Sequence, residues 1–153
     1  MIRKILIANR GEIAVRVIRA CAEMGIRSVA IYADSDRYSL HVKKADEAYS
    51  LGADPVTGYL NIHRIVNLAL ETGCDAIHPG YGFLSENARF AAVCEQRGVT
   101  YIGPSAEVIR RMGDKTEARK AMVTAGIPVT PGTNENLKDL DEALQMAEQV
   151  GYP

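Results

Sequence analysis

The sequence has few cysteines and no excess of charge of either sign, and both shortages narrow the class of protein. Its three cysteines, Cys21, Cys74 and Cys94, are odd in number and form no Cys-x-x-Cys pair. We interpret them as small core residues of a protein in a reducing cytoplasm. The 18 basic and 19 acidic residues give a net charge of -1. No nucleic-acid partner is predicted, because such binding requires a strong positive excess.

Long apolar runs are also missing. Charged residues interrupt every apolar stretch, so none approaches the ~20 residues of a membrane-spanning helix, and no membrane association is predicted. The N-terminal segment Met1–Ala8 is too short for the apolar core of a signal peptide. A chain of 153 residues with 47% apolar residues is expected to form one compact domain, with or without a tail.

Several familiar site motifs are absent as well. A dinucleotide-binding turn has the pattern Gly-x-Gly-x-x-Gly, but the first turn here contains only Gly11, so NAD binding with Asp34 on the ribose has weak support. The sequence contains no Gly-x-x-x-x-Gly-Lys-Ser/Thr phosphate loop and no Gly-x-Ser-x-Gly nucleophile turn. His41 and His63 have no partners at metal-ligand spacing, and we therefore predict no metal site in this chain.

What the sequence does contain is a regular alternation of strand and helix patterns. The predicted strands are Lys4–Ala8, Ser28–Tyr32, Ala45–Leu51, Ala76–His78 and Val99–Ile102. The predicted helices run from Glu12 to Gly25, from Ile62 to Gly73 and, capped by Ser85, to Gly98, while Asp34–Asp36 and Gly52–Gly58 are expected to be loops. Short strands flanked by helices indicate an α/β domain with a doubly wound parallel sheet that is covered on both faces.

From about residue 104 onward the pattern is helical. Ser105 is expected to cap a short helix, and two longer helices begin with capping boxes, Asp114 with Glu117 and Asp139 with Glu142. The change of pattern predicts that residues 1–103 form one domain and that residues 104–153 begin a second, helical part of the protein.

Two loops follow strands at the edge where open parallel sheets bind ligands. The first, Asn9–Glu12, is either an anion site at a helix N-terminus or a tight turn in which Asn9 and Arg10 bond neighbouring backbone or a second domain. The second, His78–Asn87, places two glycines around Tyr81, which allows close approach of a ligand. We interpret His78 itself as a hydrogen-bonded core histidine at the end of a buried strand.

Three charged residues stand out by position. Lys115 lies in the first turn of a helix, where a cation is mildly unfavourable, so it is either solvated or close to an anionic nucleotide. Arg19 and Glu23 are four residues apart on the first helix, in the less favourable order for an intrahelical pair. They face either solvent or a partner subunit.

Three segments, taken together, resemble the biotin carboxylase family. They are Ile7–Ala14, Ala76–Asn87, and Tyr101–Pro104 followed by Met112–Lys115. They occur in the family's order and at about its spacing, and the likeness extends over essentially the whole chain. It implies a Rossmann-like domain over residues 1–103, followed by a helical linker and the start of an ATP-grasp domain over residues 104–153.

The resemblance also implies a reaction, that of an ATP-dependent ligase. ATP and bicarbonate would give carboxyphosphate, which carboxylates biotin on a biotin carboxyl carrier protein, with Mg²⁺ or Mn²⁺ accompanying the ATP. A carboxyltransferase subunit or domain would then pass the carboxylate to acetyl-CoA, pyruvate or propionyl-CoA. By resemblance, Lys115 contacts ATP, Tyr81 and Gly82 border the biotin and bicarbonate pocket, and Arg19 and Glu23 lie at a homodimer contact.

The chain departs from the family pattern mainly by its length. The family's ATP lid, metal-binding glutamates, bicarbonate-holding arginine and catalytic base all fall beyond Pro153. Phosphoryl transfer requires metal and cationic clamps, so this stretch is expected to be inactive alone and to contain no catalytic residue. Two alternatives stay open: another ATP-grasp ligase, such as a relative of carbamoyl phosphate synthetase or of a purine-pathway carboxylase, and a non-catalytic module for dimerisation or small-molecule binding.

Overall fold

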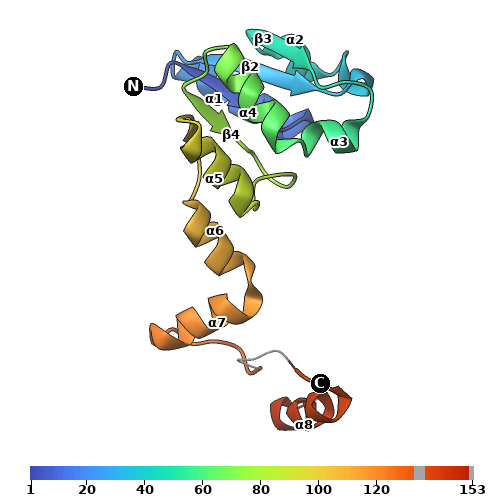
Figure 1. Ribbon diagram of the computed structural model, residues 1–153, viewed down its shortest axis with the longest axis vertical. Coiled ribbons are helices and arrows are strands. Elements are labelled where there is room, and N and C mark those ends of the chain that lie inside the picture. Colours follow the sequence, from blue (N-terminus) through green and yellow to red (C-terminus); the bar gives the residue numbers. More distant parts are fainter. Residues whose placement is uncertain (133–136, 152–153) are drawn as a thin grey trace. The chain divides into compact units, whose positions relative to one another are not determined.

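The structure, a computed structural model, describes residues 1–132 and 137–151. The chain divides into two compact units, Met1–Ile109 and Arg110–Pro153. The first unit contains all five strands and the second contains two helices, shown in the C-terminal colours of Figure 1.

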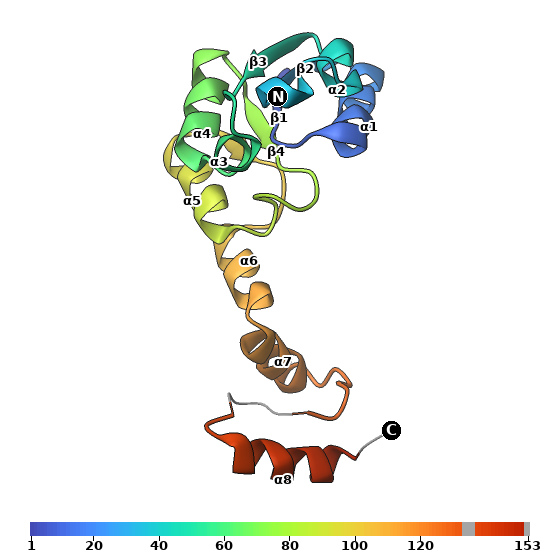
Figure 2. The ribbon, with the colours of Figure 1, turned by 90° about the vertical axis from the view of Figure 1, so that its right-hand side faces the viewer.

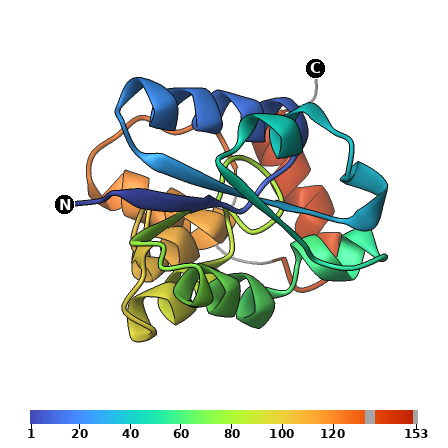
Figure 3. The ribbon, with the colours of Figure 1, turned by 90° about the horizontal axis from the view of Figure 1, so that it is seen from above.

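The first unit is built on a parallel sheet with the strand order β3-β2-β1-β4-β5. Its strands confirm the predicted ones to within two residues at each end: β1 Lys4–Ile7, β2 Arg27–Tyr32, β3 Glu47–Ser50, β4 Ala76–His78 and β5 Thr100–Tyr101. Figure 3 shows the sheet between a blue helix on one side and a green helix on the other. The predicted doubly wound α/β fold is therefore confirmed.

Helices cover both faces of this sheet. They are α1 Gly11–Glu23, α2 Leu40–Lys44, α3 Pro55–Tyr59, α4 Ile62–Glu71 and α5 Ala88–Gln96, with a 3-10 helix at Asp34–Asp36. The next helix, α6 Ala106–Gly113, follows β5 and crosses the boundary between the two units. In Figure 2, α1 and α2 lie on one side of the strands, and α3, α4 and α5 lie on the other.

The core is divided between these two faces, as the alternation of side chains along a strand requires. Along β1, Leu6 belongs to the larger cluster, with residues of α4 and α5, whereas Ile5 and Ile7 belong to a smaller cluster against α1. The two clusters bury the strands on both sides, which explains their continuous apolar sequences. The three cysteines are buried free thiols, as predicted.

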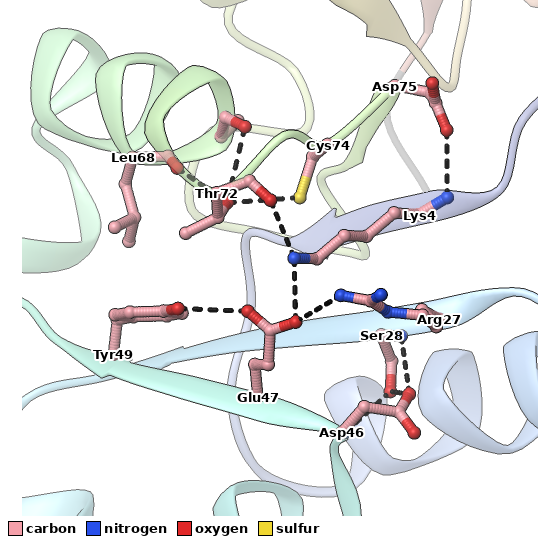
Figure 4. A network of polar contacts seen from close by, with 11 residues as sticks. Lys4, Arg27, Ser28, Asp46, Glu47, Tyr49, Leu68, Thr72, Cys74 and Asp75 are labelled. Carbon is pink, nitrogen blue, oxygen red and sulfur yellow. Dashed lines mark hydrogen bonds and ion pairs between the residues drawn. The ribbon is translucent and has the colours of Figure 1, made fainter.

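A network of charged groups lies at the amino ends of the strands (Figure 4). The Lys4 ammonium is almost buried, pairs with Glu47 at 2.7 Å and donates to the Thr72 carbonyl at 2.6 Å. Arg27 pairs with the same Glu47 oxygen at 2.6 Å, and Asp75 accepts the backbone N–H groups of Arg3 and Lys4. These contacts join β1, β2 and β3 at the edge opposite the predicted site.

Three loop and cap predictions were partly wrong. The expected loop Gly52–Gly58 contains α3, because Asp54 accepts from two backbone N–H groups and Pro55 follows at the first helical position. The helix expected to start at Ser85 begins two residues later, where the Asn87 side chain accepts from Phe90 N. The expected loop at Asp34–Asp36 is the 3-10 helix.

The helices of the second unit are α7 Lys115–Thr124 and α8 Leu140–Val150. Both start at the predicted aspartates: Asp114 accepts from Thr116 N and Glu117 N, and Asp139 accepts from Glu142 N. The described residues of these helices include none that is buried. In the described part of the chain, no helix has the length and apolar character needed to cross a membrane.

Candidate functional site

The strand order places a switch point between β1 and β4. From β1 the chain winds outward through β2 and β3 on one side and later through β4 and β5 on the other. Ligands of open parallel sheets bind at such a point, beyond the carboxyl ends of the strands. The loops that leave this point are Asn9-Arg10-Gly11 after β1 and Pro79–Asn87 after β4, the two loops singled out from the sequence.

Asn9 joins these two loops directly. Its side-chain amide donates to the carbonyl of Pro79 at 2.8 Å and to that of Tyr81 at 2.7 Å, and its Oδ1 accepts from Arg10 N at 2.9 Å. The residue is only 3% exposed. Both amide hydrogens and the amide oxygen are therefore used inside the protein, as a buried polar group requires.

The turn after β4 is close-packed against Asn9. Gly80 has φ of +66°, and a Cβ there would come within 2.6 Å of Asn9 Nδ2. The backbone N–H of Gly80 donates to His78 Nδ1 at 3.0 Å, and burial lowers the pKa of His78, so the neutral imidazole accepts this bond. His78 is a hydrogen-bonded histidine at the strand end, as interpreted from the sequence.

Tyr81 is the exposed part of this turn. Its side chain is 75% exposed, and the following Gly82 has φ of +65°. Together with His78 and Gly80, Tyr81 lines an apolar cavity of about 450 Å³, which is also lined by residues of α1, including Arg16 and Cys21. The glycine-flanked tyrosine is thus presented at a hollow surface and is not buried against its own core.

Phe83 holds the far side of the turn. It has φ of +44°, an unusual value for an aromatic residue, and its ring stacks on Tyr59 with 5.1 Å between centroids. Leu84 then enters the core, and the Tyr101 hydroxyl donates to the Ser85 carbonyl at 2.8 Å. A strained residue kept by specific contacts is a common feature of functional loops.

The first loop carries a partly buried ion pair. The Arg10 guanidinium donates to both carboxylate oxygens of Asp36, and the Tyr59 hydroxyl donates to Asp36 Oδ2 at 2.8 Å. The hydrogen bond from Arg10 lowers the pKa of Asp36 and raises that of Arg10, whereas burial raises the pKa of Tyr59. The carboxylate is therefore ionised and the phenol neutral at physiological pH.

His41 is the buried histidine nearest to this charge pair. Its Nε2 lies 3.3 Å from the Ile31 carbonyl, and burial lowers its pKa. Among the described residues it has no partner for Nδ1. His41 is a neutral, buried residue of α2 itself. Neither it nor His63 belongs to a metal cluster: over residues 1–132 and 137–151, no three His, Cys, Asp or Glu side chains gather closely enough to hold a metal ion.

The remaining predicted site residues lie on exposed helix surfaces. Arg19 and Glu23 of α1 pair with each other at 2.9 Å and are 81% and 64% exposed at their side chains. Lys115 is the exposed first residue of α7, directly after the capping Asp114. It belongs to the second compact unit and the other site residues to the first.

A parallel sheet with helices on both faces and two loops joined across its switch point defines a doubly wound α/β domain. The family is more specific: the model of the biotin carboxylase N-terminal domain matches residues 1–109, and this chain belongs to that family. A second model, the ATP-binding domain of the carbamoyl-phosphate synthase L chain, matches residues 114–153.

Known relatives extend along the whole chain. The biotin carboxylase of Halalkalibacterium halodurans is 57% identical over 154 residues, covering 100% of this chain and 34% of that protein. The 2-oxoglutarate carboxylase small subunit of Hydrogenobacter thermophilus is 56% identical over 153 residues, covering 100% of this chain and 32% of that protein. The chain thus spans about a third of the length of these relatives.

A solved structure has the same arrangement. The biotin carboxylase domain dimer of the H. thermophilus 2-oxoglutarate carboxylase, in complex with MgADP, ADP and bicarbonate, matches with a TM-score of 0.96 at 56% identity, over 100% of this chain and 34% of that one. The resemblance stated from the sequence segments is therefore confirmed at the level of family and fold.

The structure also reveals residues that sequence reasoning missed. Asp36 and Tyr59 were assigned no role, yet they connect Arg10 to the ring of Phe83. The sequence offered an anion site, neighbouring backbone or a second domain as contacts of the Asn9 loop, whereas the Asn9 amide bonds to the carbonyl of Pro79, 70 residues away in the same unit. The available signal was weak: an aspartate in a short polar segment and a tyrosine before a helix have no local pattern that marks them.

Proposed function

We propose that this chain forms the N-terminal part of a biotin carboxylase, an ATP-dependent ligase. In this reaction a bicarbonate oxygen attacks the γ-phosphorus of ATP and ADP leaves. The carboxyphosphate formed then transfers its carboxyl group to the ureido nitrogen of biotin, which gives up its proton as phosphate leaves. Residues 1–103 would be the Rossmann-like domain and residues 104–153 the linker and start of the ATP-grasp domain. The observation that supports this most is the position of the Tyr81 turn, which lies exposed at the switch point of the sheet in a domain of the biotin carboxylase family.

Three groups of residues receive roles in this proposal. Tyr81 and Gly82 border the pocket for biotin and bicarbonate, since they are exposed beside the cavity at the ligand edge. Lys115 contacts the phosphates of ATP, because its ammonium is exposed at the start of a helix in the segment that matches an ATP-binding domain. Arg19 and Glu23, on the outer surface of α1, lie at a homodimer contact.

The cofactor and partners follow from the same proposal. Mg²⁺ or Mn²⁺ would accompany the ATP, held by residues in the part of the relatives that this chain does not cover. Biotin would arrive on a biotin carboxyl carrier protein and leave toward a carboxyltransferase subunit or domain. We place the protein in the cytoplasm, since its three cysteines are free thiols.

The test is a chimera in which this chain replaces the corresponding 153 residues of the H. thermophilus small subunit. We expect ADP formation that depends on both bicarbonate and biotin, as in the unmodified subunit. The control is the same subunit with those residues deleted. A folded chimera without this activity contradicts the proposal and favours a non-catalytic module, and activity that ignores biotin favours another ATP-grasp ligase.

A further inference from the structure

The turn from Pro79 to Phe83 must be held in place from outside, because its own sequence gives it little rigidity. Gly80 and Gly82 both adopt positive φ values, at +66° and +65°, which glycine reaches readily but does not enforce. Tyr81 between them is 75% exposed and has no core to pack against. A pocket wall made from such a turn requires contacts that fix its carbonyls.

Asn9 supplies those contacts from the end of β1. It takes the carbonyls of Pro79 and Tyr81 at 2.8 and 2.7 Å, one on each side of Gly80. The missing Cβ of Gly80 is what allows the amide to come so close. The pairing of β1 with β4 does not depend on this side chain, because Ile7 faces His78 in register and Ala8 N donates to the His78 carbonyl at 2.8 Å.

A second contact holds the turn from its other flank. The Phe83 ring stacks on Tyr59, and the Tyr59 hydroxyl is bound to Asp36, which in turn is held by Arg10. One side of the turn is therefore held directly by Asn9, and the other side is held by Arg10 through Asp36 and Tyr59. The two loops at the switch point hold each other in place, although they are far apart in the sequence.

We infer that Asn9 is a positioning residue that fixes the Tyr81 turn as a wall of the biotin and bicarbonate pocket, an inference that rests on the function proposed above. Because Asn9 is only 3% exposed, it acts through the backbone of Tyr81. A misplacement of about 1 Å in a pocket wall reduces turnover by up to about 100-fold. The effect should appear in the kinetics for biotin and should leave KM for ATP unchanged.

The sharpest variant is Asn9→Asp in the chimera. The carboxylate keeps the acceptor for Arg10 N but has no hydrogen to donate, and it faces two carbonyl oxygens. Asn61→Asp is the matched control, because the Asn61 side chain only accepts, from Arg64 N at 3.0 Å, at the start of α4. The measurements are KM for free biotin, KM for ATP and kcat, with hydrogen exchange at the amides of residues 80–83.

For Asn9→Asp we expect KM for biotin to rise about tenfold or kcat to fall by a similar factor, with KM for ATP within about twofold. Exchange at residues 80–83 should be faster, and Asn61→Asp should behave as the parent. If Asn9→Asp does not fold, Asn9→Ser takes its place: its short hydroxyl carries no charge and cannot reach both carbonyls, and the same division between biotin and ATP is expected.

Two results would overturn the inference. One is a folded Asn9 variant with parental kinetics for biotin. The other is an equal loss toward ATP and biotin together with lower thermal stability, which is the signature of a purely structural residue. A parent chimera without biotin-dependent activity is a different outcome, because it contradicts the proposed function itself.

Discussion

The guanidinium of Arg10 binds the carboxylate of Asp36 through two nitrogens, with Nε donating to Oδ2 at 2.7 Å. Asp36 is only 5% exposed, whereas the Arg10 side chain is about half exposed. The pair connects the turn after β1 with the segment after β2, and its geometry is the bidentate one that gives arginine–carboxylate pairs their directionality. Neutralising the buried partner should therefore reveal how much the edge of the sheet depends on it.

Asp36→Asn should lower the free energy of unfolding of the chain by about 2 kcal/mol. The substitution removes the charge that accepts from Arg10 and Tyr59 while keeping the shape of the side chain. Urea unfolding followed by circular dichroism measures the change. Asp34→Asn is the matched control, because Asp34 is exposed and its carboxylate accepts from the neutral Ser50 hydroxyl, and it should cost about 0.5 kcal/mol or less. Equal effects at both positions would contradict the role given to Asp36.

Acid should destabilise the protein through the network at the amino ends of the strands. The hydrogen bond from Lys4 is the largest of several contacts that lower the pKa of Glu47 from 4.5 to about 2. The unfolded chain thus binds this proton at higher pH than the folded chain, so stability is full above about pH 4.5 and is lost as the pH falls toward 2. The pKa values of Asp36, Asp46 and Asp75 are also lowered and add to the same trend.

The contribution of Glu47 can be isolated by substitution. In Glu47→Gln, the slope of unfolding free energy against pH should be smaller between pH 4.5 and 2 than in the parent. Glu117→Gln serves as control, because its ion pair with Lys120 is exposed on α7. An unchanged slope in Glu47→Gln would show that the pKa of Glu47 is not lowered by folding.

Gly80→Ala should be more damaging than the same change at Gly25. Both glycines have nearly equal positive φ, +66° and +67°, so both pay the conformational cost of about 1–2 kcal/mol. Only at Gly80 would the new methyl group meet Asn9 Nδ2, at 2.6 Å, whereas nothing lies within 4 Å at Gly25. We expect an additional loss of about 1–3 kcal/mol at Gly80, measured by urea unfolding. Equal losses of unfolding free energy at Gly80 and Gly25 would mean that the turn can move away from Asn9 without cost.

Lys115→Ala should weaken ATP binding in the chimera by about tenfold, because a charged hydrogen bond to phosphate contributes about 1.5–3 kcal/mol. KM for ATP and the dissociation constant of MgADP are the measurements. Lys120→Ala is the matched control on the same helix, since Lys120 pairs with Glu117 at 3.3 Å. Parental values of both KM and kcat in Lys115→Ala would remove Lys115 from the ATP site.

Arg19→Glu should shift a chimeric dimer toward monomer by placing a carboxylate beside Glu23. Analytical ultracentrifugation measures the change, and Arg97→Glu, on the exposed end of α5, is the control. The exchanged double variant Arg19→Glu with Glu23→Arg restores the intrahelical pair. If the double variant stays monomeric, the dimer contact requires arginine at position 19 and glutamate at position 23, in that order. If Arg19→Glu stays dimeric, neither residue belongs to the interface.

Most of the fold could be predicted from local patterns. β1, β2 and β4 are short apolar runs ended by polar residues or glycines, and α1 and α4 show the helical period followed by Gly25 and Gly73. Those signals work because periodicity and left-handed glycine stops are properties of a few consecutive residues. The start of α5 was misplaced because Ser85 and Asn87 are both good caps, and only the path of the chain decides between them.

The sequence alone determined the strand and helix alternation, the free buried cysteines and, through three motif segments, the family. Tertiary structure decided which loops meet: Asn9 reaches Pro79 and Tyr81, and Arg10 finds Asp36, because the strand order brings β1 beside β4 and β2. Such partners are separated by tens of residues, and no local propensity encodes a hydrogen bond across that distance. The parallel winding of the sheet brings them together at a single edge.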